Sequence, residues 1–283
     1  MGVVLISCAA SFAWFTRLQI RSALREKVSL ENRSMAQVLT RSIISGIKSD
    51  ALFSYDSPLL PWFKPFFVPV GDTVWVVQVV PLNDKIPIRS VFLPDGNTLR
   101  NELRRVWENL WEKLEKREMN VPLLDFMDKD AKPRMGGAER ETHINRYPVD
   151  ISELLILEGM TPELLYGSRE KSGAADYCTL WSDGKINLNV APIHVLEILP
   201  GLDRTLAEKI VEFREREPLK KIADLRDIPG FPPRAVTGLT NLVDFRSQYF
   251  MIKIEMLEDL GGGTSFNIIF DKSAGRVVRW EEI

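Results

Sequence analysis

Cysteine and histidine are scarce in this sequence of 283 residues, which contains two of each. Cys8 lies in an apolar N-terminal run and Cys178 lies in a part expected to be soluble, so an internal disulfide is not expected. Neither His143 nor His194 stands at zinc-site spacing from a cysteine or a second histidine. The sequence also lacks a glycine-rich phosphate loop and a nucleophile elbow around a serine. We therefore expect no catalytic site and no enzymatic activity.

A surplus of charge of one sign is also lacking. Lys and Arg number 37 and Asp and Glu number 39, which gives a net charge of -2. This balance does not indicate a nucleic-acid partner, because such partners are usually bound by a strongly basic surface. The length is sufficient for two domains with their own cores, since domains usually contain roughly 100 to 200 residues.

The sequence has no long uncharged run. Gly2 to Thr16 carries no charge, but its 15 residues are fewer than the roughly 20 that an untilted helix needs to cross a bilayer. Apolar residues then recur at helical spacing, without a proline before Pro58. The pattern predicts a helix over residues 1–48, either one continuous spine or a signal anchor followed by a separate amphipathic helix. We expect its membrane and partner face to contain Leu5, Phe12, Phe15, Ile20, Leu24, Val28, Met35, Leu39 and Ile43.

Basic residues follow the apolar run and none precedes it. By the positive-inside rule this arrangement would keep the remaining chain in the cytoplasm. A basic leader upstream of Met1 would reverse that expectation.

Strand-like segments flank a long helical region. Residues 56–69, rich in proline and aromatic residues, are expected to form a loop, residues 73–80 a strand and residues 88–93 its partner. Helices are expected over residues 99–118, 151–157 and 161–165, and strands over residues 249–256, 265–270 and 275–280. The expected fold class is α+β, with a small antiparallel sheet interrupted by a large helical insert. The expected divisions are 1–48 for the helix, 49–94 and 248–283 for the sheet, and 95–247 for the insert.

Two similar helical hairpins are expected within residues 185–247. In the first, Asn189 is the expected N-cap of a helix that ends at Pro200-Gly201, and Thr205 and Glu208 have capping-box spacing at the start of the next helix. A second Pro-Gly turn follows 29 residues later, at Pro229-Gly230. Paired hairpins of this type either bind DNA phosphates through backbone N–H groups or pack within a protein.

The residues after each turn favour packing over DNA binding. Asp203 would repel a phosphate and Pro232 has no N–H to donate. Residues 185–246 contain ten Lys plus Arg and nine Asp plus Glu, so no basic face is expected. No nucleic-acid partner is expected, and a membrane-anchored DNA receptor of the competence type is the alternative.

The densest acidic cluster borders an irregular segment that contains Pro133 and Gly136-Gly137. Calcium prefers six to eight oxygen ligands on a bent backbone, and such a loop can supply them. A solvated loop whose charges are balanced by nearby Lys and Arg explains the same pattern. The candidate metal ligands are Asp125, Asp128, Asp130 and Glu139.

The order of these features resembles one family, the K-type minor pseudopilin of type II secretion, also called general secretion pathway protein K. The resemblance rests on the N-terminal apolar helix and on six segments spread over most of the chain: residues 124–128 (LDFMD), 133–139 (PRMGGAE), 154–167 (LLILEGMTPELLYG), 185–192 (KINLNVAP), 199–202 (LPGL) and 247–250 (SQYF).

The resemblance implies a pilin-like helix and sheet interrupted by a large α domain. It implies anchorage of the N-terminal helix in the bacterial inner membrane, with the soluble part in the periplasm. The implied role is at the tip of the pseudopilus, with the I-type and J-type minor pseudopilins and other pseudopilins as partners. Because the family includes calcium-binding members, the resemblance also supports calcium as the ion for the acidic cluster.

Overall fold

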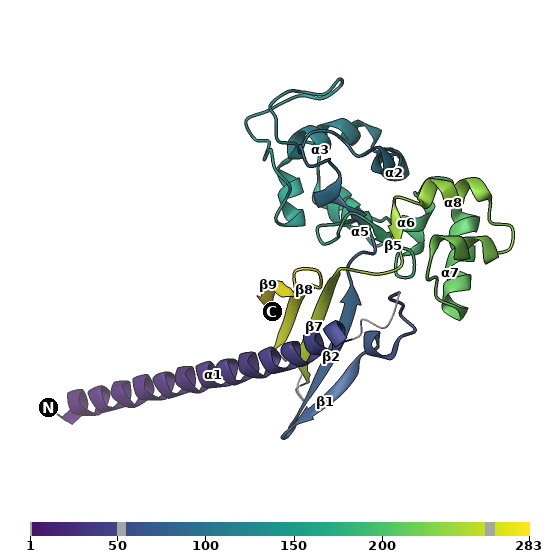
Figure 1. The fold of residues 1–283 in the computed structure, drawn as a ribbon. Coiled ribbons are helices and arrows are strands. Elements are labelled where there is room, and N and C mark those ends of the chain that lie inside the picture. The colour runs from purple at the N-terminus through teal and green to yellow at the C-terminus, as the bar shows by residue number, and fades with distance from the viewer. Residues whose placement is uncertain (1, 50–54, 258–263) are drawn as a thin grey trace.

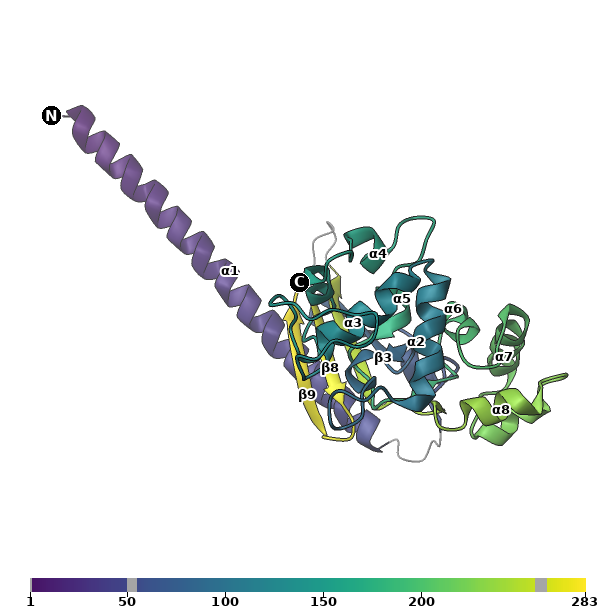
Figure 2. The same cartoon turned by 90° about the horizontal axis from the view of Figure 1, so that it is seen from above.

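A single long helix dominates the N-terminal part of the computed structural model, which describes residues 2–49, 55–257 and 264–283. Helix α1 (Gly2–Ser49) has 48 residues and extends well beyond the rest of the molecule (Figures 1 and 2). At ~1.5 Å per residue its length is about 72 Å. The continuous helix is therefore confirmed, and the alternative of an anchor with a separate second helix is wrong. The apolar run was expected to enter a membrane, but no helix among the described residues combines the length and hydropathy needed to cross one.

Five antiparallel strands form the sheet, in the order β1-β2-β7-β8-β9. Their bounds are β1 (Phe66–Val70), β2 (Thr73–Pro81), β7 (Tyr249–Leu257), β8 (Ser265–Asp271) and β9 (Arg276–Glu282). The central pair joins distant parts of the sequence, because β2 pairs with β7 from Val74↔Leu257 to Pro81↔Phe250. The three expected C-terminal strands are confirmed.

The C-terminal half of α1 packs on one face of this sheet. Ala36 and Ile47 are fully buried there, against a cluster that includes Trp75 of β2 and Phe250 of β7. An ion pair of 2.7 Å between Arg33 and Glu282 joins the same half of the helix to the edge strand β9. Among the described side chains of α1, residues 12–48, buried positions occur only from Asn32 onward.

Two expectations about the first strands are wrong. Residues 66–69 belong to β1 and not to a loop, and they form an edge strand, where Pro69 is tolerated because one side of the strand needs no ladder hydrogen bonds. Residues 88–93 do not pair with β2. Ile88 to Ser90 forms the 3₁₀ helix η2, and the apolar side chains of Ile88 and Val91 are buried in the core of the insert.

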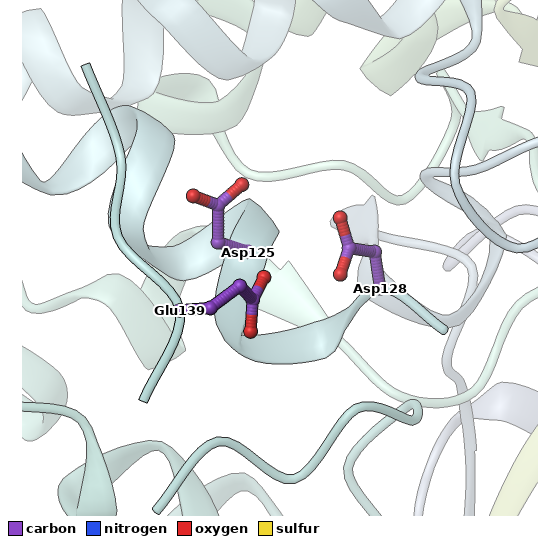
Figure 3. Close-up of side chains that lie close together, drawn as sticks. All are labelled: Asp125, Asp128 and Glu139. Carbon is purple, nitrogen blue, oxygen red and sulfur yellow. The ribbon is translucent and has the colours of Figure 1, made fainter. Parts of the chain in front are cut away.

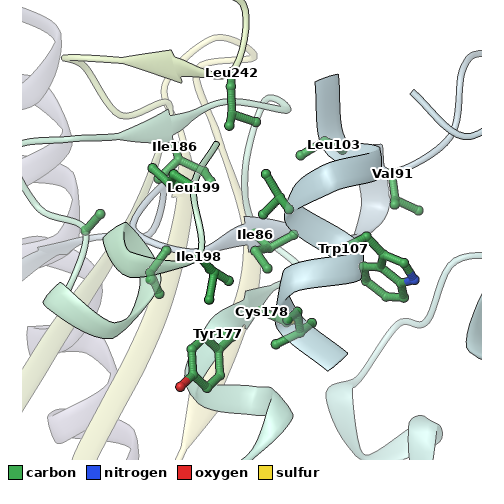
Figure 4. Close-up of a cluster of buried hydrophobic side chains, with 14 of the residues drawn as sticks. Ile86, Val91, Leu103, Trp107, Tyr177, Cys178, Ile186, Ile198, Leu199 and Leu242 are labelled. Carbon is green, nitrogen blue, oxygen red and sulfur yellow. The ribbon is translucent and has the colours of Figure 1, made fainter. Parts of the chain in front are cut away.

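Between β2 and β7 the chain forms a mainly helical insert with a core of its own. That core includes Ile86, Trp107, Ile186 and Leu199 (Figure 4), and Trp107 and Trp111 are both fully buried. The helices are α2 (Asn101–Lys113), α3 (Asn120–Met127), α4 (Pro162–Tyr166), α5 (Ala174–Tyr177), α6 (Ile193–Glu197), α7 (Arg204–Arg216) and α8 (Pro233–Leu239). Short 3₁₀ segments are η1 (Pro61–Phe63), η3 (Arg117–Met119), η4 (Ile151–Ile156) and η5 (Ile222–Asp227), and short strands are β3 (Ile86–Pro87), β4 (Cys178–Thr179), β5 (Ile186–Asn187) and β6 (Val243–Asp244).

The side chain of Asn83 ties the two ends of the insert together. It is fully buried, and its Oδ1 accepts hydrogen bonds from the backbone N–H groups of Gln248 and Tyr249. The side-chain amide nitrogen donates to Asp183, 2.8 Å away, and the backbone carbonyl of Asn83 accepts from the backbone N–H of Asn187. These bonds connect the end of β2, the start of β7 and the turn before β5.

The paired hairpins are present, but their caps differ from those expected. The first hairpin joins α6 to α7 and the second joins η5 to α8. Asn189 does not cap a helix, because its buried amide donates to the carbonyl of Leu219 and accepts from the N–H of the same residue. The cap of α7 is Asp203, whose carboxylate accepts from the N–H of Leu206 at 2.8 Å, so Thr205 is not part of a capping box.

Candidate functional site

Three carboxylates converge at the C-terminal end of α3. Asp125 lies in the last turn of that helix, Asp128 is its C-cap residue, and Glu139 comes from the loop that folds back over it (Figure 3). One oxygen from each group lies within 4.8 Å of the others, and both aspartates are buried. The structure therefore brings together three of the four acidic residues expected from the sequence.

The fourth candidate, Asp130, does not join this group. Its carboxylate accepts a hydrogen bond from the backbone N–H of Lys132 at 3.0 Å and so closes a turn of its own. It lies beyond the end of α3, where the chain has left the helix, so spacing in the sequence does not bring it to the other three. Its charge still affects the site, because it contributes to the raised pKa of Asp128.

Arg134 provides the cation for part of this negative charge. Its guanidinium donates to Asp125 at 2.9 Å and also contacts Asp128 and the carbonyl oxygen of Asn97. The backbone N–H of Arg134 donates to Asp125 as well. One arginine facing three ionised carboxylates leaves a net charge of -2 in a largely buried place, which matches the charge of a divalent cation.

Five buried polar atoms of these carboxylates and of the loop that follows Glu139 have no hydrogen-bond partner within the described parts of the chain. They are one oxygen of Asp128, both oxygens of Glu139, Nδ1 of His143 and the side-chain oxygen of Asn145. Nδ1 of His143 lies 3.3 Å from Glu139, but the pair does not have hydrogen-bond geometry. Buried polar groups without partners are rare in folded proteins and commonly indicate a water or an ion. Four of the five atoms are oxygens, the ligand atoms that calcium prefers.

Burial raises the pKa of Asp128 to about 6. Loss of solvation is the main cause, Arg134 opposes it, and the neighbouring carboxylates add to it. A bound cation would reverse this effect, because it stabilises the ionised carboxylate.

The loop that carries Glu139 approaches α3 closely through a glycine. A Cβ atom on Gly137 would lie 1.9 Å from Oδ2 of Asp125, so only glycine fits there without movement of the carboxylate. The preceding Gly136 has a positive φ of 86°, a conformation that glycine adopts without strain. The two glycines therefore let the loop turn and place Glu139 against the aspartates.

His143 and Asn145 were not among the expected site residues. Asn145 adopts a positive φ of 44°, which is uncommon for a residue other than glycine, and its N–H donates to the carbonyl of Phe126 on α3. The position of His143 four residues after Glu139 was the available signal in the sequence. The signal is weak because the segment is irregular and has no helical periodicity.

The expected partner face of α1 divides into an exposed and a packed part. Phe12, Phe15, Ile20, Leu24 and Val28 are each at least half exposed, from 50% for Val28 to 73% for Phe12. Further along the helix, the side chains of Met35, Leu39 and Ile43 are partly buried and pack against the sheet. The side chain of Leu5 lies outside the described residues. Large apolar groups exposed in such number usually indicate a contact surface.

The glycine of the first hairpin turn is used for packing. A Cβ atom on Gly201 would lie 3.2 Å from the Cα of Ala235, so this turn rests directly against α8 of the second hairpin. The N–H of Leu202 is bonded to Leu199 and the N–H of Phe231 to Ile228 within their own turns. These contacts leave the turns poorly arranged for phosphate.

Comparisons with known proteins agree with this description. Residues 182–243 match the helix-hairpin-helix motif family. Type II secretion system protein K of Dickeya chrysanthemi is 24% identical over 149 residues, which are 48% of this chain and 40% of the relative, so the chain spans less than half of that protein's length in the match. A chain in the crystal structure of the GspK-GspI-GspJ complex from the enterotoxigenic Escherichia coli Type 2 secretion system has the same fold, with a TM-score of 0.62 at 12% identity over 91% of this chain and 99% of that one.

The relative and the solved structure come from the same secretion system and match different properties of the chain. The first shares sequence with part of it and the second shares its fold over nearly all of it. The resemblance expected from the sequence, to protein K of type II secretion, is thus confirmed.

Proposed function

We propose that this chain is a minor pseudopilin of the K type, which assembles with I-type and J-type subunits at the tip of the type II secretion pseudopilus. The observation that carries the proposal is the division of α1, whose last turns pack on the sheet while large apolar side chains between Phe12 and Val28 are exposed. The matching chain from the solved secretion complex supports it. In this role the protein is an assembly component for secretion and not an enzyme.

The exposed half of α1 is the proposed partner surface. In the assembled tip its apolar residues pack against helices of neighbouring pseudopilins, and the start of the helix lies at the inner membrane. The sheet and the insert then lie in the periplasm. The hydrophobic contribution is substantial, since burial of one large apolar side chain contributes about 1.5 to 3 kcal/mol.

Substitution of Val28 by Asp tests this surface. Val28 is half exposed in the isolated chain, so the charge should not disturb the fold, but it should prevent burial against a partner helix. Co-purification with I-type and J-type subunits and secretion should both be lost. Gln37→Asp is the matched control, because exposed Gln37 lies nine residues after Val28 and so, at 3.6 residues per turn, on the opposite side of the same helix. Unchanged co-purification of the Val28 variant would contradict the proposal.

We also propose that the acidic group binds calcium as a structural ion. Asp125, Asp128 and Glu139 would provide carboxylate oxygens and Asn145 an amide oxygen, which are the ligand types that calcium prefers. The ion would neutralise the remaining charge of -2 and would hold the loop against the end of α3.

Calorimetric titration of the protein with calcium tests this proposal. Asp128→Asn should weaken binding by at least about tenfold, or ~1.4 kcal/mol. Asp130→Asn is the matched control, since Asp130 lies outside the converging group, and it should change the affinity much less. Absence of calcium binding at millimolar concentration, or equal weakening by both variants, would refute the site.

A DNA receptor is the second candidate, because residues 182–243 match the helix-hairpin-helix motif family. Gel-shift measurement at low salt separates the two functions. The pseudopilin role predicts no shift together with co-elution of the I-type and J-type subunits. Appreciable DNA affinity that falls steeply with salt would support the receptor instead.

A further inference from the structure

A cavity of about 410 Å³ lies beside the acidic site, between η2, the start of α2 and the end of α3. Its volume lies within the range of roughly 300 to 1,000 Å³ that is common for ligand sites. Aromatic and aliphatic side chains, including Phe92 and Tyr147, form its apolar wall, and their rings stack with centroids 6.0 Å apart.

Three cationic side chains line this cavity, those of Arg89, Arg100 and Lys129. Arg100 is already engaged, because it pairs with Glu102 at 2.6 Å and donates to the carbonyls of Ser90 and Gly184. Arg89 and Lys129 are different: neither side chain has an ion pair or a hydrogen bond to another of the residues that the structure describes. Two cations are therefore available to a ligand.

The framework of the cavity holds these cations in place. The guanidinium of Arg89 lies over the ring of Trp181, with 5.7 Å from Cζ to the centroid. The backbone N–H of Lys129 donates to Oδ1 of Asn97, and its aliphatic chain lies over Gly96, where a Cβ atom would be 2.4 Å from Cδ. Arg89 and Lys129 are exposed residues, and these contacts restrict their side chains before a ligand binds, which lowers the entropy lost on binding.

Two acidic groups near the cavity form no ion pair with these cations among the described residues. Asp95 directs its carboxylate into its own turn, where it accepts from Thr98 and Asn97, and the charge of Lys129 acts on it from beyond ion-pair distance. Asp183 lines the cavity, but it accepts from Asn83 at 2.8 Å and burial raises its pKa. Even with Asp183 ionised, the three cationic residues give the lining of the cavity a net positive charge.

We propose that this cavity binds a carboxylate carried on an apolar stem, in an acidic peptide segment of another protein. Arg89 and Lys129 would pair with the carboxylate, and the Phe92 and Tyr147 wall would cover the stem. Charge complementarity supports this occupant, because charge-assisted hydrogen bonds from Arg or Lys to a carboxylate are among the stronger polar contacts. The proposal depends on neither the pseudopilin role nor the calcium site.

Fluorescence anisotropy of a labelled hexaglutamate peptide tests the site. The full chain is used in mild detergent at about 50 mM salt, where electrostatic contacts are weakly screened. Divalent cations are left out because the peptide itself binds them. The double variant Arg89→Gln, Lys129→Gln should weaken binding at least about tenfold. The control Arg234→Gln, Arg276→Gln removes the same charge from two exposed positions and should change it by less than about twofold.

A hexaglutamine peptide should not bind, and circular dichroism should be the same for all variants. Absence of hexaglutamate binding at millimolar peptide would overturn the proposal. Equal weakening by the two double variants would do so too, since it would show attraction to overall charge alone. Competition by inorganic phosphate as strong as that by the peptide would identify a general anion site and would reject the acidic-peptide ligand.

Discussion

Replacement of Arg134 by Met removes the cation that holds two buried carboxylates. Asp125 and Asp128 have side-chain exposures of 0% and 2%, and that of Arg134 is 25%. Loss of one partner of a buried ion pair costs about 3 to 5 kcal/mol, and the partial exposure of the arginine favours the lower end, about 3 kcal/mol. For a chain of this size 1 kcal/mol lowers the melting temperature by roughly 2 to 4 °C. We therefore expect a decrease of about 6 to 12 °C without calcium.

Arg140→Met is the matched control for this measurement by scanning fluorimetry. Arg140 pairs with Glu158 on the surface, where their side chains are 53% and 71% exposed, so its loss should have little effect on stability. Calcium at about 100 times its dissociation constant should stabilise the native chain by ~2.7 kcal/mol, and the Arg134 variant by at least as much, because the ion replaces the lost cation. A decrease below about 2 °C, or an equal decrease in the control, would refute the assignment of Arg134 as the partner of two buried charges.

Two further predictions follow from particular contacts. Calcium affinity should fall as the pH decreases through about 6, and not only near the ordinary aspartate pKa of 3.8, because a proton on Asp128 competes with the ion. Calorimetry at several pH values checks this. A calcium affinity that stays unchanged down to pH 5 would contradict it. Asn189→Ala should lower the free energy of unfolding by about 2 to 4 kcal/mol in urea titrations, since both backbone groups of Leu219 lose their partner. Thr205→Ala, at an exposed position, should cost less than about 0.5 kcal/mol, and equal effects would contradict the assigned roles.

Local sequence patterns were sufficient to predict the helices and strands whose apolar side chains alternate or recur over many residues. The 48-residue helix α1 and the C-terminal strands β7 to β9 agree with the periodicity of their apolar residues. The helix expected over residues 161–165 is also present as α4, and its first turn is stabilised locally, because the side chain of Thr161 accepts from the N–H of Leu164 three residues later. Such features depend on neighbours in the sequence, and their physical cause acts within a few residues.

Expectations failed where a distant contact decided the outcome. Residues 88–93 are apolar enough for a strand, but the core of the insert buries Ile88 and Val91 and leaves β1 and β7 to pair with β2. Asparagine often caps helices, but the side chain of Asn189 is buried and bonds to the backbone C=O and N–H of Leu219, 30 residues away in the sequence. Short segments can adopt several structures, and tertiary burial selects among them.

The sequence by itself determined the α+β class, the long first helix, the insert between strands and the four acidic candidates from which the group of three carboxylates is drawn. Only the tertiary structure decided which oxygens converge, that Arg134 balances part of their charge, and that Asp130 does not join them. It also decided which half of α1 is covered by the sheet. The physical reason is that apolar periodicity identifies the buried face of a helix or strand, whereas the desolvation and pairing of charged side chains depend on what packs against that face.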